Sequence, residues 1–186
     1  MEYIEVFLKE VVEEKTSNDC HTIILENEDA TIRIPIIIDS YDAEAIISVL
    51  EDEKESRPHT HELLVNFANL TGYLVRKVEI TDFEKGVFSA TITFGNTGAD
   101  NLRLDSRPSD AITIALKTGC RMFVAEKVVE RVGVLMGSSH EEATPFQKII
   151  AMEKRLSELV ENELYEEAAK LRDVINAYKS SKDPVS

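Results

Sequence analysis

The sequence has no tryptophan, and aromatic residues make up only 6% of its 186 residues. Proteins that bind single-stranded nucleic acid stack bases on aromatic side chains, so this chain has few residues from which to build such a platform. Basic residues are also scarce: 21 Lys and Arg stand against 35 Asp and Glu, which gives a formal net charge of −14 at pH 7. Duplex DNA is held by clustered Lys and Arg. The composition therefore excludes a broad cationic surface but leaves room for a local basic patch.

Other absences narrow the class of protein further. The only two cysteines, Cys20 and Cys120, lack partners at metal-ligand spacing, and we interpret them as reduced thiols of a cytoplasmic protein. No apolar run approaches the ~18 residues of a membrane span, and the acidic N-terminus is unlike a signal peptide. HxxxH, CxxC and DxD patterns are absent, so spacing predicts no metal site. We expect a soluble cytoplasmic protein without membrane contact.

Hydrophobic residues make up 43% of the chain, enough for a sizeable core. Apolar alternation, β-branched runs and turn residues predict strands at residues 4–12, 21–26, 30–38, 73–81, 87–94, 102–105 and 121–125. Helical spacing predicts helices at 42–51, 60–71, 108–119 and 126–131, the first with Asp42 as its N-cap. Pro35 predicts a sheet edge or a bulge. This order of elements predicts an α+β fold with mixed or antiparallel sheets and three main helices.

The C-terminal part of the sequence has a different pattern. We expect one domain over residues 1–135, a linker over 136–143, an αα-hairpin over 144–179 and a frayed tail over 180–186. Thr144, Pro145 and Gln147 form a strong helix start. A hairpin of this size cannot build a core of its own, so its apolar seam must pack on the main domain, a second copy or another protein. Exposed strand edges and this seam favour a homodimer or a higher homo-oligomer.

Two stretches are distinctive enough to resemble known families. Residues 57–64 (RPHTHELL) and 105–111 (DSRPSDA), preceded by 34–38 (IPIII) and Glu44-Ala45, resemble the bifunctional nuclease family over about residues 1–135. Residues 164–173 resemble the UVR motif shared by UvrB and UvrC. The resemblance implies a domain with DNase and RNase activity in some members, followed by a hairpin that docks a partner protein. Asp39 stands where the family pattern leads us to expect glycine, which predicts an altered local turn.

Hydrolysis of a phosphodiester needs an activated water, stabilisation of the developing charge and a proton for the leaving oxygen. The residues best suited to these roles lie in or near the two motifs: Glu44, Arg57, His59, His61, Asp105, Arg107 and Asp110. We predict Arg57, His61, Arg107 and Asp110 as the catalytic set. The two arginines would hold phosphate, His61 would transfer protons, and Asp110 would orient a partner or hold a divalent metal such as Mg²⁺ or Mn²⁺.

Each of these residues also has a purely structural interpretation. Asp110 lies in the first turn of its expected helix, where a carboxylate complements the helix dipole, and Arg107 could pair with Asp110 or Asp105. His59, like His21 and His140, is better explained as structural or solvent-exposed. Residues 103–131 contain six Lys and Arg against four Asp and Glu, so this stretch should repel phosphate less than the rest of the chain does.

Two function classes therefore stay open. The first is a nuclease acting on DNA or RNA, or on both. The alternative is a non-catalytic regulatory or interaction module that acts through the UVR-like hairpin.

Overall fold

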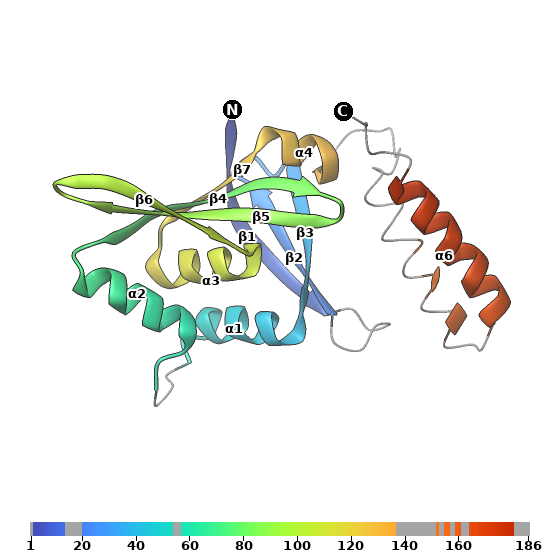
Figure 1. Ribbon diagram of the computed structural model, residues 1–186, viewed down its shortest axis with the longest axis horizontal. Helices are drawn as coiled ribbons and strands as arrows, with labels where there is room; N and C mark the ends of the chain where they lie inside the picture. The colour runs from blue at the N-terminus through green and yellow to red at the C-terminus, as the bar shows by residue number, and fades with distance from the viewer. Residues whose placement is uncertain are drawn as a thin grey trace.

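One mixed sheet of eight strands organises the fold (Figure 1). The computed structural model describes residues 2–13, 20–53, 57–136, 152, 155–156, 159–160 and 164–180. The strands are β1 (Tyr3–Glu13), β2 (Cys20–Asn27), β3 (Ile32–Asp39), β4 (Leu74–Glu84), β5 (Val87–Asn96), β6 (Ala99–Ser106), β7 (Arg121–Ala125) and β8 (Val134–Leu135). The helices are α1 (Ser40–Leu50), α2 (Thr60–Leu70), α3 (Pro108–Thr118), α4 (Glu126–Val132) and α6 (Tyr165–Ser180).

The sheet consists of two antiparallel groups joined by a short central strand. Its order is β6-β5-β4-β7-β1-β2-β3-β8. Strand β7 runs parallel to β4, with Val78 opposite Met122, and antiparallel to β1, with Ile4 opposite Val124. The remaining neighbours are antiparallel. The sequence prediction of an α+β fold is confirmed, with a single mixed sheet in the part of the chain that is described.

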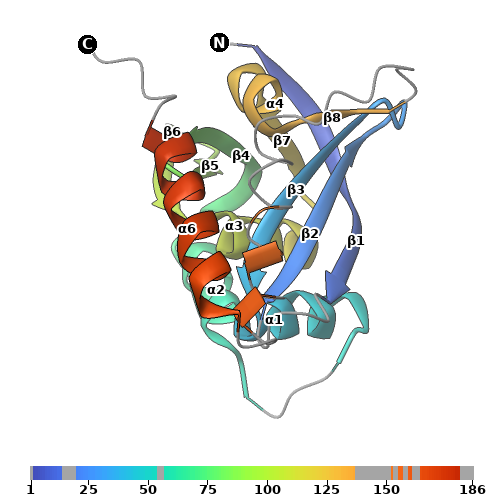
Figure 2. The same cartoon turned by 90° about the vertical axis from the view of Figure 1, so that its right-hand side faces the viewer.

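Helix α3 lies at the centre of the core. It packs against β4, β5 and β7 on one side and against α1 and α2 on the other (Figures 1 and 2). All five residues from Ala111 to Ala115 are buried, as expected for a helix covered on several sides. The sheet supplies fully buried aliphatic side chains from both groups of strands, among them Ile23, Ile34 and Ile92. The position of the α3 N-terminus is therefore fixed by the packing of the whole core.

The start of α1 differs from the sequence prediction. Asp39, not Asp42, is the N-cap: its Oδ1 accepts a hydrogen bond of 2.8 Å from the backbone N–H of Asp42. The prediction of Asp42 as the N-cap was therefore wrong, and the carboxylate of Asp42 takes another role. The prediction for Pro35 is confirmed, because its strand β3 borders β8, which pairs only with Ile32 and Arg33.

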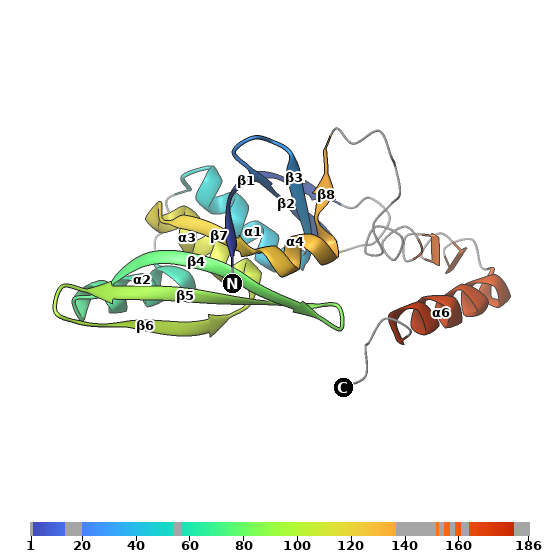
Figure 3. The same cartoon turned by 90° about the horizontal axis from the view of Figure 1, so that it is seen from above.

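The predicted C-terminal hairpin is described only in part. Its second helix is α6, which lies apart from the sheet in Figure 3, whereas most of its first helix lies outside the described residues. Leu159, Ala168 and Ile175, three apolar residues of the predicted hairpin, are buried. Most of the predicted linker and tail also lies outside the described residues. No helix among those described is both long and apolar enough to cross a membrane.

We predict that Ile112→Ala destabilises the protein strongly. Ile112 is completely buried on α3, so its truncation should lower the free energy of unfolding by about 2–5 kcal/mol through lost apolar contacts and a residual cavity. Ile37→Ala on β3 is the matched control, because Ile37 is 43% exposed and should cost about 1 kcal/mol or less. Urea unfolding measures both values. Equal losses would contradict the central position of α3.

Candidate functional site

The N-terminus of α3 brings two charged residues of the second motif together. Arg107 is the extended N-cap residue and Pro108 occupies the first helical position, where a backbone N–H is not needed. One helical turn places Asp110 beside Arg107. The guanidinium donates from Nε to Asp110 Oδ2 at 2.9 Å and from Nη2 to Asp110 Oδ1 at 3.2 Å. This two-point contact fixes the planes of both groups.

His61, from the first motif, joins the same carboxylate from α2. Its Nε2 lies 3.0 Å from Asp110 Oδ1, and its side chain is only 14% exposed. Because an ionised carboxylate only accepts hydrogen bonds, this contact assigns the ring proton to Nε2 and leaves Nδ1 as an acceptor when the ring is neutral. The two motifs, 49 residues apart along the chain, thus meet at Asp110.

Opposing effects set the pKa of Asp110, which contacts both Arg107 and His61. Burial raises the pKa of Asp110, but the hydrogen bonds from Arg107 and His61, together with their charges, outweigh burial and hold that pKa below its ordinary value. The bonds to Asp110 likewise raise the pKa of Arg107 above its ordinary value. The site therefore combines an ionised carboxylate with a permanently charged guanidinium.

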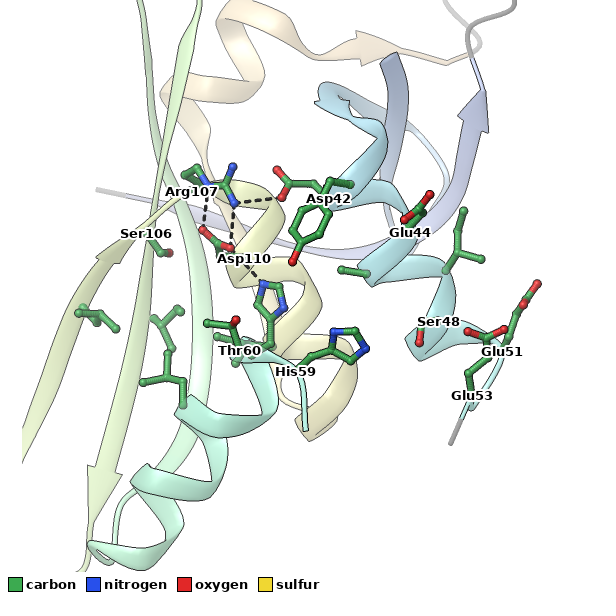
Figure 4. A pocket seen from close by; sticks show the side chains of 18 of the residues that line it. Asp42, Glu44, Ser48, Glu51, Glu53, His59, Thr60, Ser106, Arg107 and Asp110 are labelled. Carbon is green, nitrogen blue, oxygen red and sulfur yellow. Dashed lines mark hydrogen bonds and ion pairs between the residues drawn. The ribbon is translucent and has the colours of Figure 1, made fainter. Parts of the chain in front are cut away.

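Asp42 on α1 completes the group (Figure 4). Its Oδ1 accepts from Arg107 Nη2 at 3.0 Å, and its Oδ2 accepts from Ser109 Oγ at 2.8 Å. The side chain is 7% exposed, so both bonds offset the cost of burying a carboxylate. The sequence prediction missed Asp42 and Ser109. One signal was present: Asp42 shares its helix face with Ala43 and Ile46, which are core residues.

These residues lie at a cleft of about 780 Å³ between α1, α2, the start of α3 and the end of β6. Ile92, Leu104 and Ile114 supply part of its apolar lining. The charged residues of the lining are six carboxylates against one arginine, namely Asp42, Glu44, Glu51, Glu53, Asp105, Asp110 and Arg107. The cleft is therefore acidic overall, with its positive charge confined to Arg107.

The other predicted site residues fall into two groups. Glu44, His59 and Asp105 line the cleft. His59 is also the N-cap of α2, and its backbone N–H donates to Glu62 Oε2 at 3.1 Å. Arg57 is exposed and is not among the lining residues. The structure thus brings together three members of the predicted catalytic set, His61, Arg107 and Asp110, and leaves Arg57 outside.

The locally positive stretch predicted at residues 103–131 is neutralised in the fold. Every Lys and Arg in it pairs with a carboxylate: Arg103 with Glu79, Arg107 with Asp42 and Asp110, Lys117 with Glu62, Arg121 with Glu5, and Lys127 and Arg131 with Asp82. Five of these acids, Glu5, Asp42, Glu62, Glu79 and Asp82, lie outside the stretch. Local charge in the sequence was therefore a poor guide to surface charge.

The donor set does not match a metal centre. Within the described residues, no three His, Cys, Asp or Glu side chains are grouped to hold a metal ion. All four carboxylate oxygens of Asp42 and Asp110 already accept hydrogen bonds from Arg107, Ser109 or His61. A cation bound between them would have to displace the guanidinium.

Comparisons with known proteins agree with both motifs. Residues 23–137 match the model of the bifunctional nuclease domain, and residues 147–181 match that of the UvrB/UvrC motif. An uncharacterized protein of Mycobacterium tuberculosis is 32% identical over 123 residues, which cover 66% of this chain and 73% of that protein. Bifunctional nuclease 1 of Oryza sativa subsp. japonica is 25% identical over 137 residues, covering 72% of this chain and 40% of the rice protein. For bifunctional nuclease 1 of Arabidopsis thaliana the identity is 22% over 185 residues, covering 87% of this chain and 57% of that protein.

We predict that Asp110→Asn makes the protein less stable at neutral pH but not in acid. A carboxyl whose pKa is lowered by folding stabilises the native state above its unfolded pKa of about 3.9, and this contribution disappears as pH falls through the lower folded pKa. The stability gap between the native chain and the variant should therefore be largest near pH 7 and shrink below about pH 4. Urea unfolding across this range measures the gap. Asp29→Asn, in an exposed turn, is the control, and an equal pH dependence in both variants would contradict the role of Asp110.

Proposed function

Because the chain belongs to the bifunctional nuclease domain family, as its sequence predicts, we propose that it hydrolyses phosphodiester bonds of nucleic acid at the cleft beside α3. The observation that supports this proposal most strongly is the linked group of Arg107, Asp110 and His61 at that cleft. It combines a phosphate-binding cation with an oriented proton acceptor, and these are two of the requirements of the reaction.

Arg107 is suited to hold the phosphate. Its Nε and Nη2 are fixed by Asp110 and Asp42, whereas its Nη1 makes no hydrogen bond to the described residues. The side chain is 59% exposed, which suits the approach of a phosphate oxygen to the guanidinium. A guanidinium held in place before the substrate arrives stabilises the negative charge that develops on the phosphoryl oxygens at little cost in reorganisation.

His61 is suited to activate the water. With Nε2–H donated to Asp110, Nδ1 accepts a proton from water while the water oxygen forms a bond to phosphorus. The bond from phosphorus to the leaving oxygen then breaks, and that oxygen takes up a proton from the imidazolium or from solvent. Asp110 keeps the ring in the required tautomer and stabilises the imidazolium, so it is a positioning residue here.

A non-catalytic interaction module is the second candidate, and one observation favours it. Tyr165 and Val174 on α6 are 64% and 52% exposed, and α6 lies within the UvrB/UvrC motif match. Exposed apolar side chains on a helix suit a protein partner. The two candidates concern different parts of the chain and are separated by an activity assay.

We predict that His61→Ala lowers kcat/KM for nucleic acid hydrolysis by about 100-fold or more, the usual effect of losing a general base. Arg107→Ala should also lower it strongly, because charge stabilisation is lost. The assay uses single-stranded and duplex DNA and RNA, each with Mg²⁺, Mn²⁺ or EDTA. His21→Ala and Arg121→Ala remove the same residue types away from the cleft and should leave activity unchanged.

Variants purified in the same way as the native chain also control for contaminating nucleases. Circular dichroism and thermal melting confirm that each variant is folded. A native chain without activity on any of these substrates favours the interaction module. Activity that survives His61→Ala and Arg107→Ala unchanged contradicts the site.

A further inference from the structure

Strand β6 leaves one edge of the sheet open. It is the terminal strand in the sheet order, and no described strand pairs with its outer side (Figure 3). It spans eight residues, Ala99–Ser106, and contains no proline. Exposed edges of this kind offer unpaired backbone N–H and C=O groups to another strand.

The two faces of β6 have different chemistry. Leu102 and Leu104 lie opposite Phe94 and Ile92, which are buried on the helix-covered side of the sheet, yet these leucines are 51% and 42% exposed. Arg103 alternates with them and therefore lies on the other face. The edge thus presents apolar side chains on one face and charged side chains on the other.

Helix α2 extends this apolar surface. Leu63, Phe67 and Leu70 are 57%, 65% and 87% exposed, and their spacing of four and three residues places them in one stripe. Leu64, which neighbours this stripe on the helix, lines the cleft together with Leu104. Leu104 on β6 and Leu64 on α2 therefore border the same cleft, and the docking region consists of the β6 edge and the α2 stripe.

We propose that a second copy of this chain docks on this region, with the two β6 strands paired antiparallel about a twofold axis. Such an axis, perpendicular to the sheet, keeps every side chain on its own face, and residues that lie opposite each other share a face. The axis must therefore pass through the position of one residue rather than between two.

Charge then selects the register. An axis at Leu104 sets Leu104 against Leu104 of the partner subunit, and twice sets an arginine, Arg103, against an aspartate, Asp105. An axis at Arg103 instead opposes two arginines, and an axis at Leu102 pairs Arg103 with the uncharged Asn101. Opposite charges across antiparallel strands stabilise the pair, and like charges destabilise it. The pattern Arg-Leu-Asp at 103–105 is thus self-complementary about Leu104.

This arrangement also borders the cleft. Leu104 lines the cleft at the end of β6, so the contact between the two Leu104 side chains would lie beside it. The pairs of Arg103 and Asp105 would lie on the other face of the sheet, because these residues alternate with Leu104 along the strand.

Sedimentation equilibrium of the full chain tests the proposal. We expect a dimer, and we expect Asp105→Arg to lower its association constant by at least about tenfold, because two pairs of opposite charges become pairs of like charges. Adding Arg103→Asp restores opposite charges with exchanged signs and should recover association. Glu28→Arg makes the same change of charge at an exposed position after β2 and should have no effect.

Two further variants do not alter Arg103, which also pairs with Glu79 at 3.6 Å. Phe67→Asp changes an exposed residue of the α2 stripe and should weaken association. Leu104→Cys, with Cys20 and Cys120 changed to serine, should form a disulfide between subunits under mild oxidation. A native chain that stays monomeric across the micromolar range overturns the proposal, as does an Asp105→Arg variant that associates normally. None of these outcomes depends on nuclease activity.

Discussion

The buried carboxylate of Asp42 is the constraint on which the site depends. At 7% exposure it needs hydrogen-bond donors, and both donors, Arg107 and Ser109, come from the start of α3. The contact therefore fixes α1 against α3 and at the same time holds the guanidinium of Arg107. Arg107 in turn orients Asp110, and Asp110 orients His61 on α2. The helices α1, α2 and α3 are thus connected through one chain of contacts that runs from Asp42 through Arg107 and Asp110 to His61.

The charges of Asp42, Arg107 and Asp110 are compatible with the proposed proton transfer to His61. Asp42 and Asp110 carry two negative charges and Arg107 one positive charge, so the group has a net charge of −1 while His61 is neutral. A proton taken up by His61 makes the group neutral, and Asp110 lies 3.0 Å from the ring to stabilise it. The low pKa of Asp110 keeps that carboxylate ionised and available as an acceptor. Asp42, by contrast, has both oxygens engaged away from the histidine and acts on it only through Arg107 and Asp110.

Local sequence signals predicted the parts of the site that local chemistry determines. Pro108 marked the start of α3, and the short motifs around His61 and Arg107 indicated the residues that meet. Asp42 was not predictable in this way, because its role depends on Arg107, 65 residues away. Two aspartates three residues apart, Asp39 and Asp42, are equally plausible helix caps on composition alone. Only the packing of α1 on α3 decides that the first caps the helix and the second is buried.

The charge of residues 103–131 likewise could not be interpreted from local sequence alone. The charges observed in the fold constrain how a polyanion could bind. Residues 103–131 are positive in sequence, yet each cation there meets a carboxylate, in most cases from another element. Proteins that hold DNA through 6–10 phosphate contacts lose binding steeply with salt, with a slope of about −0.9 per contact. In the proposed binding mode Arg107 supplies about one such contact. Binding of a polyanion at this cleft would therefore depend on salt much less steeply, with a slope of about −1, and selectivity would have to come from the shape of the cleft.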